Sequence, residues 1–258
     1  MAHWTLNSYS TYQWICVSLE QHLWCFCASR QPSPNQEVLH CKHLELYSAL
    51  SAFTQVSNMP DVFYLGHSYV SSLADHLQNF CPSTLGPDTA ASLMGISNHF
   101  SHLHLHGQSG AAILKPDSFT VPYAALHFHR PQVVLLEFGS NDLACGAEPL
   151  PVASAIVALA KELVSLGVRR TIIFGPLIRT ANLSVTLDIM TANSRRCNTI
   201  LYHLCDVEKQ LEFRTHNGFW DVPVHQWSRD GIHPNTQEGR RKHKRSIRFA
   251  ALEALGHV

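Results

Sequence analysis

Four short polar segments of this 258-residue chain carry side chains that could together perform acyl transfer. They are residues 66–68 (Gly-His-Ser), 106–110 (His-Gly-Gln-Ser-Gly), 139–142 (Gly-Ser-Asn-Asp) and 229–234 (Arg-Asp-Gly-Ile-His-Pro). A serine hydroxyl is too weakly acidic to attack an ester until an imidazole takes its proton, and a carboxylate then orients that imidazole. The oxyanion of the tetrahedral intermediate needs backbone N–H groups or an asparagine amide as donors. The four segments contain all of these groups, and Asp230 and His233 are close enough in sequence for one turn to present both.

The segments follow apolar runs that are typical of buried strands. Hydrophobic patterning predicts strands at 62–65, 101–106, 133–138, 171–174 and 211–214, and helices at 69–80, 117–130, 152–166, 186–208 and 236–255. This alternation predicts βαβ units and a parallel sheet covered on both faces, which is a three-layer α/β/α domain. Ligands bind beyond the carboxyl ends of the strands in such sheets, so we expect the polar segments to meet at one edge.

In type and order, the four segments resemble the sequence blocks of the SGNH (GDSL-like) hydrolases, across residues 60–256. The resemblance implies a flavodoxin-like sheet, the SGNH hydrolase fold. It also implies that Ser68 is the nucleophile, that His233 is the general base and that Asp230 orients His233. The oxyanion hole would consist of the N–H groups of Ser68 and Gly110 and the amide of Asn141.

The function implied by this resemblance is that of a serine esterase that acts on a small or acetylated ester through an acyl-enzyme. Such an enzyme needs no cofactor and no metal ion. A Phe-Trp-Asp sequence at 219–221 further resembles a subgroup of animal SGNH-domain proteins, some of which are tied to retroelements. The alternative function is a catalytically silent binding module with the same fold, in which Ser68 only caps the following helix.

His67 departs from the family pattern, because the family usually has aspartate before the nucleophile. That aspartate does not belong to the catalytic set, so its replacement does not remove the chemistry. We expect the turn to be held differently, and a second imidazole beside Ser68 could compete for the hydrogen bond of its hydroxyl.

The His-x-His-x-His run formed by His102, His104 and His106 is the main rival signal. Alternate positions on a strand point to one face, and two histidines in this spacing are typical of a zinc pair. His127 and His129 have the same spacing. No third ligand can be named from the sequence, so the primary hypothesis contains no metal site and metal binding by this run stays an alternative.

Charge is balanced overall but unevenly distributed. The 19 basic and 19 acidic residues give no global field that would attract nucleic acid or an anionic membrane. The predicted helix at 236–255 nevertheless contains Arg240, Arg241, Lys242, Lys244 and Arg245. This run predicts a solvated helix face, with a nucleic-acid-binding or nuclear-localisation patch as the alternative.

Residues 1–58 differ from the rest of the chain and are predicted to be an N-terminal extension, with a short helix at 37–53, before a domain at 59–258. No apolar run approaches the roughly 18 residues of a membrane span, and the N-terminus lacks the basic start of a signal peptide. The eight cysteines form no CxxC pair, which favours reduced, buried thiols. We therefore expect an intracellular protein, cytoplasmic or nuclear, that binds a small or acylated substrate and no membrane.

Overall fold

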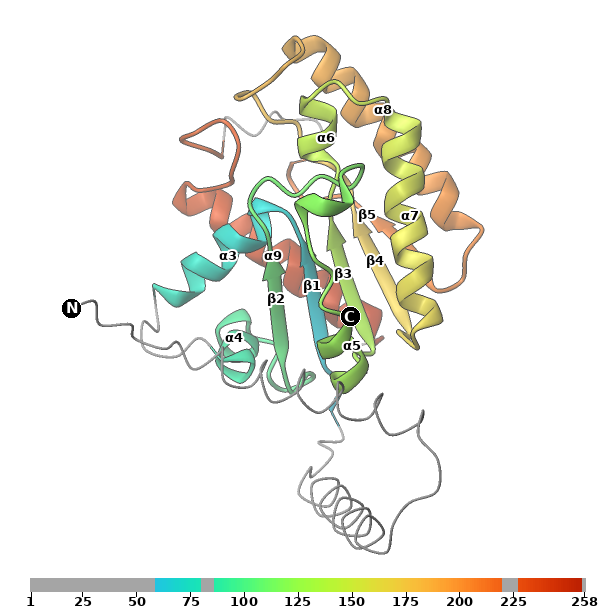
Figure 1. Ribbon diagram of the computed structural model, residues 1–258. Helices are drawn as coiled ribbons and strands as arrows, with labels where there is room; N and C mark the ends of the chain where they lie inside the picture. The colour runs from blue at the N-terminus through green and yellow to red at the C-terminus, as the bar shows by residue number, and fades with distance from the viewer. Residues whose placement is uncertain (1–58, 80–85, 220–226, 257–258) are drawn as a thin grey trace, which may run out of the picture. The chain divides into compact units, whose positions relative to one another are not determined.

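The strand order of the sheet confirms the predicted fold class. The computed structural model describes residues 59–79, 86–219 and 227–256 (Figure 1). These ranges contain a five-stranded parallel sheet of order β2-β1-β3-β4-β5. Its strands are β1 (Val62–Gly66), β2 (Leu103–Gly107), β3 (Val133–Glu137), β4 (Arg170–Phe174) and β5 (Leu211–Arg214). This is the flavodoxin-like order, in which the chain direction across the sheet reverses between β1 and β3.

Helices cover both faces of this sheet (Figure 1). They are α3 (Ser68–Gln78), α4 (Pro87–Met94), α5 (Tyr123–His129), α6 (Ser140–Ala144), α7 (Pro149–Ser165), α8 (Leu187–Asp206) and α9 (Gln237–Ala254). Phe63 and Leu65 of β1 pack in one core with α7 and α8. Val62 and Tyr64 pack in the other core with α3, α4 and α9. Successive side chains of a strand point to opposite faces, so a strand with helices on both sides must be apolar throughout.

Most predicted helices and strands are present with small shifts of their ends. The helix predicted at 117–130 is the exception, because it is shorter than predicted. The helix predicted at 117–130 is a short 3₁₀ turn at Pro116–Ser118 followed by α5. Pro122 explains the break, because the residue before a proline avoids the helical region of backbone conformation. The patterning also missed α4 and the short helix α6, which begins directly after the polar turn at Gly139.

Some predictions fall outside the described residues. These are the extension at 1–58 with its helix at 37–53, and the second and third positions of the Phe-Trp-Asp sequence at 219–221. Among the described helices, none is both long enough and apolar enough to cross a bilayer. Three described cysteines are unpaired, of which Cys197 and Cys205 are buried as expected, but Cys145 is exposed.

Candidate active site

The candidate site lies at the carboxyl edge of the sheet, around the reversal point between β1 and β3. Ser68 follows β1 and begins α3, which packs on one face of the sheet. Asn141 follows β3 and lies in α6, which packs with the core of the other face. Consecutive connections leave the sheet on opposite faces here, and ligands of open α/β sheets bind at such a reversal point.

His67, rather than Ser68, caps the helix that follows β1. The backbone N–H of Tyr69 donates to His67 Nδ1 at 3.4 Å, and His67 itself has the extended backbone of an N-cap residue. Ser68 is therefore the first residue of α3 and not its N-cap. Ser68 is half-buried, and its hydroxyl makes no hydrogen bond to any described residue. Within the described residues, the His67 ring makes no hydrogen bond to the hydroxyl of Ser68.

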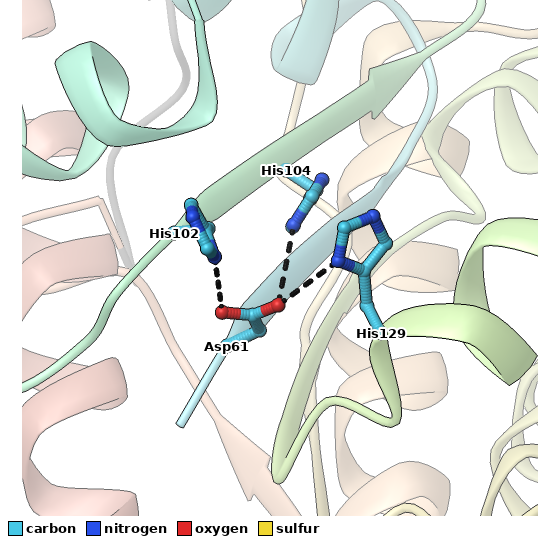
Figure 2. Close-up of side chains that lie close together, drawn as sticks. All are labelled: Asp61, His102, His104 and His129. Atoms are coloured by element: carbon cyan, nitrogen blue, oxygen red, sulfur yellow. Dashed lines mark hydrogen bonds and ion pairs between the residues drawn. The ribbon is translucent and has the colours of Figure 1, made fainter. Parts of the chain in front are cut away.

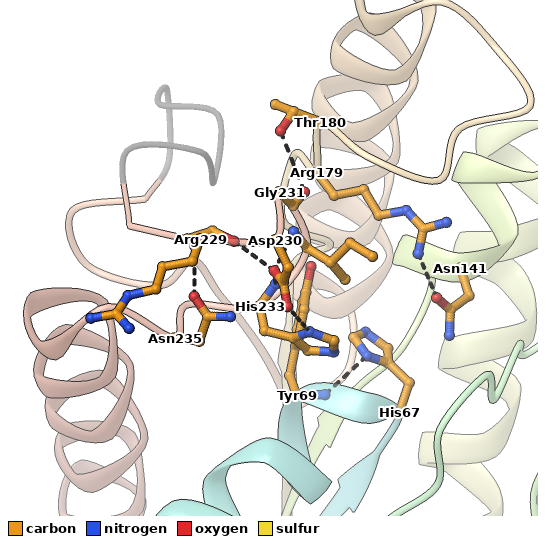
Figure 3. A network of polar contacts seen from close by, with 12 residues as sticks. His67, Tyr69, Asn141, Arg179, Thr180, Arg229, Asp230, Gly231, His233 and Asn235 are labelled. Atoms are coloured by element: carbon orange, nitrogen blue, oxygen red, sulfur yellow. Dashed lines mark hydrogen bonds and ion pairs between the residues drawn. The ribbon is translucent and has the colours of Figure 1, made fainter.

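Asp230 and His233 form the hydrogen-bonded pair that their spacing predicts (Figure 3). Asp230 Oδ2 lies 2.8 Å from Nδ1 of the His233 ring, while Oδ1 accepts from the backbone N–H groups of Ile232 and His233 at 2.9 and 2.8 Å. Burial raises the pKa of Asp230, but the hydrogen bonds from His233, Ser228 and Ile232 outweigh it and hold the pKa of this carboxyl well below its usual range. Asp230 therefore stays ionised and fixes the orientation of the imidazole.

Tyr69 links this pair to the turn that carries Ser68. The Tyr69 ring contacts the His233 ring edge-on at a centroid distance of 5.7 Å and the His67 ring at 4.3 Å (Figure 3). Burial, together with the charges of His233 and Arg179, lowers the pKa of His67 to about 3. His67 is therefore a neutral, buried imidazole at neutral pH. Ser68 and His233 themselves are not joined by a hydrogen bond within the described residues.

The predicted oxyanion donors lie in three segments, which follow β1, β2 and β3. Asn141 is held at both ends of its amide. Oδ1 accepts from Arg179 Nη1 at 2.8 Å (Figure 3), and Nδ2 donates to the Ala111 carbonyl at 2.7 Å. An asparagine amide has two N–H donors, so the contact with Ala111 leaves the second N–H of Asn141 unused. Gly110 has a left-handed backbone, with φ of 78°, which presents its N–H in a turn that other residues rarely adopt.

No protein-family model matches the sequence, and no curated protein matches it. Solved structures do match the fold. A GDSL-like lipase from Bacteroides thetaiotaomicron aligns with a TM-score of 0.54 and 16% identity, over 81% of this chain and 98% of that chain. A carbohydrate esterase of family 3 from Talaromyces cellulolyticus aligns with a TM-score of 0.51 and 17% identity, over 78% and 100%.

The chain has the fold of the GDSL-like hydrolases. An acetyl esterase whose structure contains an acetate ion is a further match, with a TM-score of 0.51 and 15% identity over 77% of this chain and 99% of that chain. The expectation of a GDSL-like fold is thereby confirmed, while identities this low leave the roles of individual residues to the geometry of this chain.

Arg179 is a residue of the candidate site that the sequence patterning missed. It lies in the loop after β4, is buried, and donates from Nη2 to the Asn182 carbonyl at 2.6 Å as well as to Asn141. Burial lowers the pKa of its guanidinium. The fourth strand ends at Gly175-Pro176, and a search for polar residues beyond that end would have found Arg179.

Asp142 positions the loop that carries Gly110. This carboxylate is buried and accepts from the backbone N–H groups of Ile113 and Leu114 at 3.0 and 2.9 Å. Burial raises the pKa of Asp142. Asp142 therefore ties the loop after β2 to α6, and so holds two of the predicted oxyanion donors, Gly110 and Asn141, in a fixed relation.

A buried polar cluster around Glu137 contacts the turn that precedes Ser68. Glu137 ends β3, where its carboxylate accepts from the hydroxyl of Tyr64 and lies 2.8 Å from His216 Nε2 and 3.3 Å from His243 Nε2. Burial raises the pKa of Glu137, but the two imidazoles outweigh it and set the pKa at about 2. The Glu137 carbonyl also accepts from the His67 N–H at 3.2 Å. This cluster therefore anchors the turn before Ser68.

Within the part of the chain that the structure describes, two groups of side chains have the composition and spacing to hold a metal ion. One is the buried cluster of Glu137, His216 and His243, and the other, at the opposite edge of the sheet, consists of Asp61, His102, His104 and His129. Neither group includes Ser68 or His233, so neither contributes a residue to the predicted catalytic set.

Proposed function

We propose that this chain is a serine esterase of SGNH type, which hydrolyses a small or acetylated ester through an acyl-enzyme. The observation that carries the proposal is the 2.8 Å contact between Asp230 Oδ2 and His233 Nδ1 at the edge of the sheet where Ser68 begins α3. The acetyl esterase among the structures with this fold supports the choice of a small acyl group. The reaction uses no cofactor.

In the proposed reaction, the hydrogen bond to Asp230 leaves Nε2 of His233 as the nitrogen that accepts a proton. His233 takes the proton of Ser68 Oγ as this oxygen attacks the ester carbonyl, and the resulting imidazolium is stabilised by Asp230. The N–H groups of Ser68 and Gly110 and the Asn141 amide donate to the oxyanion. Collapse of the intermediate breaks the bond to the alcohol, which leaves with the proton from His233. Water, activated by His233, then releases the acid and restores Ser68.

The test compares wild type with Ser68→Ala in p-nitrophenyl acetate turnover and in labelling by a fluorophosphonate probe. We expect the wild type to turn over the ester and to be labelled, and Ser68→Ala to lose both. Ser72→Ala, on the same helix, is the matched control and should behave like the wild type. Absence of labelling in the wild type, or labelling that persists in Ser68→Ala, would reject the nucleophile.

A second candidate function is the binding of nucleic acid by the basic face of α9, in a catalytically silent module of the retroelement-linked subgroup. Arg245 and Arg248 are exposed, and Arg245 lines a surface cavity of about 380 Å³ together with Arg241 and Lys242. Arg241 pairs with Glu238 at 2.9 Å, and Lys242 Nζ lies 3.5 Å above the ring of Trp227, so part of the positive charge is engaged within the protein.

This candidate predicts that labelled oligonucleotides bind with an affinity that falls steeply as salt increases. Fluorescence anisotropy of wild type beside Arg245→Glu/Arg248→Glu measures it. A nucleic-acid-binding function requires weaker binding by the double variant, and equal binding by both proteins contradicts it. A catalytically silent module should hydrolyse no p-nitrophenyl acetate in either form, whereas the proposed esterase predicts equal hydrolysis by both, because α9 supplies no group of its reaction.

A further inference from the structure

Three imidazoles converge on one carboxylate at the amino ends of the first two strands, far from Ser68 (Figure 2). Asp61 directly precedes β1, His102 directly precedes β2, His104 lies within β2, and His129 ends α5. Asp61 Oδ1 lies 2.6 Å from His102 Nδ1, while Oδ2 lies 3.1 Å from His129 Nδ1 and 3.6 Å from His104 Nε2. Segments distant in sequence thus bring four potential ligands together.

The composition and spacing of this cluster fit a tetrahedral metal site. Three imidazole nitrogens and one carboxylate oxygen all lie within 4.8 Å of one another. Zinc binds such ligands at about 2.0–2.1 Å, which places neighbouring ligand atoms about 3.3 Å apart. Small rotations of the side chains would therefore close the cluster around an ion.

Asp61 does not give every imidazole of the cluster a hydrogen bond, as His104 shows. Its side chain is only 8% exposed, and its Nε2 has no hydrogen-bond partner although it points toward Asp61 (Figure 2). A buried nitrogen without a partner is destabilising by about 1–3 kcal/mol. A metal ion bound to Nε2 would remove this deficit, because the nitrogen would then have a partner.

Contacts outside the cluster orient two of the imidazoles as metal ligands are usually oriented. The other nitrogen of His102, Nε2, lies 2.9 Å from Asp88 Oδ1, and metal-bound histidines commonly donate their second N–H to a carboxylate. The Phe63 ring stacks on His104 with centroids 4.2 Å apart, which fixes the plane of that imidazole.

We propose that Asp61, His102, His104 and His129 bind one divalent transition-metal ion, with zinc the best match to their chemistry. The ion joins the start of β1 to β2 and to α5. His106 lies outside the group of ligand atoms that are within 4.8 Å of one another, so the His-x-His-x-His run contributes only its first two members. The third and fourth ligands come from Asp61 and His129, which no local spacing could reveal.

The bound ion stabilises the fold and takes no part in ester hydrolysis. Asp61 and Ser68 lie at opposite ends of β1, whose five residues span about 16 Å at about 3.3 Å per residue. The proposal therefore stands independently of the proposed esterase function. Removal of the ion should lower the unfolding temperature without changing the rate of ester hydrolysis at a temperature where the protein stays folded.

The experiment titrates the full chain, freed of any affinity tag and stripped with a chelator, with Zn²⁺ by calorimetry and with Co²⁺ by visible absorption. We expect one ion per chain and a tetrahedral Co²⁺ spectrum without thiolate charge-transfer absorption. His129→Gln and His104→Gln should each weaken binding at least tenfold. His127→Gln is the matched control, because His127 is exposed on the same helix and lies outside the cluster, and it should bind as the wild type does.

His129→Gln also keeps the test decisive if loss of the buried His104 prevents folding. Zn²⁺ should raise the unfolding temperature of the wild type and of His127→Gln, but not that of His129→Gln. The proposal is overturned if the wild type binds no ion, or if His129→Gln binds with wild-type affinity. It is equally overturned if Glu137→Gln abolishes binding while His129→Gln and His104→Gln do not, because the ion would then occupy the cluster around Glu137.

Discussion

The carboxylate of Asp230 contacts both the ring and the backbone of His233. Oδ2 lies 2.8 Å from Nδ1 of the ring, and Oδ1 accepts from the backbone N–H at 2.8 Å. The Gly231 carbonyl accepts from the Thr180 N–H at 2.8 Å, which ties this turn to the loop after β4. A single carboxylate thus sets both the position of His233 and the tautomer in which Nε2 accepts a proton.

Replacing Asp230 by asparagine should lower kcat for p-nitrophenyl acetate by about 10³-fold or more, with little change in KM. The amide can donate to Nδ1 and so favours the wrong tautomer of His233, a change that costs about 10⁴ in serine proteases. Asp206→Asn, at an exposed site at the end of α8, is the control and should keep wild-type kcat. A loss of less than tenfold in Asp230→Asn would contradict the assigned role.

Arg179 should act as a positioning residue through Asn141. Removing an oxyanion donor with Asn141→Ala should lower kcat by about 10²–10³-fold. Arg179→Ala should lower kcat as well, because the Asn141 amide loses the donor that orients its oxygen. Arg179→Lys keeps one donor and should fall between wild type and alanine.

A double-mutant cycle tests this coupling. If Arg179 acts through Asn141, Arg179→Ala should have little further effect on kcat in the Asn141→Ala background. Additive losses would instead mean that Arg179 acts on the substrate directly or only on folding. Urea unfolding of each variant separates loss of stability from loss of orientation.

Stability should fall as the pH drops from neutrality, because His67 is buried in its neutral form. Its pKa is about 3 in the folded protein against an ordinary value of 6.5, so the unfolded chain binds more protons between these values. The free energy of unfolding therefore decreases by about 1.4 kcal/mol for each pH unit below 6.5 through this group. Urea unfolding at several pH values measures the slope.

His67→Asn should flatten this slope, since asparagine does not titrate and remains a good N-cap. His127→Asn, at an exposed position, should leave it unchanged. Glu137 adds a second dependence of stability on pH, which lies at lower pH than that of His67. Its pKa is about 2 in the folded protein and 4.5 ordinarily, so the stability it contributes is complete above 4.5 and is lost as the pH falls toward 2. An unchanged slope in His67→Asn between pH 6 and 5 would refute the buried neutral state.

Gly110 should tolerate substitution according to backbone conformation rather than size. A Cβ at this position meets no atom within 4 Å, but φ is 78°. This conformation costs a residue with a side chain about 1–2 kcal/mol, and the cost is lower for asparagine than for alanine. We expect kcat to decrease in the order glycine, asparagine, alanine, as the N–H at this position becomes less well placed. Equal kcat values for the two variants would argue against a role for the Gly110 N–H.

Local sequence features determined several parts of this protein. The apolar runs of β1 and β3 identify strands buried on both faces, and both are buried at every position. Thr186 and Thr236 mark the starts of α8 and α9 because a threonine side chain caps the first N–H groups of a helix. The pairing of Asp230 with His233 was also predictable, since residues three apart can meet within a single turn.

Only the tertiary structure decided which distant groups meet. The contact of Arg179 with Asn141, the cluster around Glu137 and the convergence of His102, His104 and His129 on Asp61 all join residues more than 25 positions apart. These contacts depend on the order of strands in the sheet, which places β1 between β2 and β3. Hydrophobic periodicity shows that a segment is a buried strand but carries no information about its neighbours. Strand order is set instead by the packing of the whole domain, which determines the surroundings of each titratable side chain.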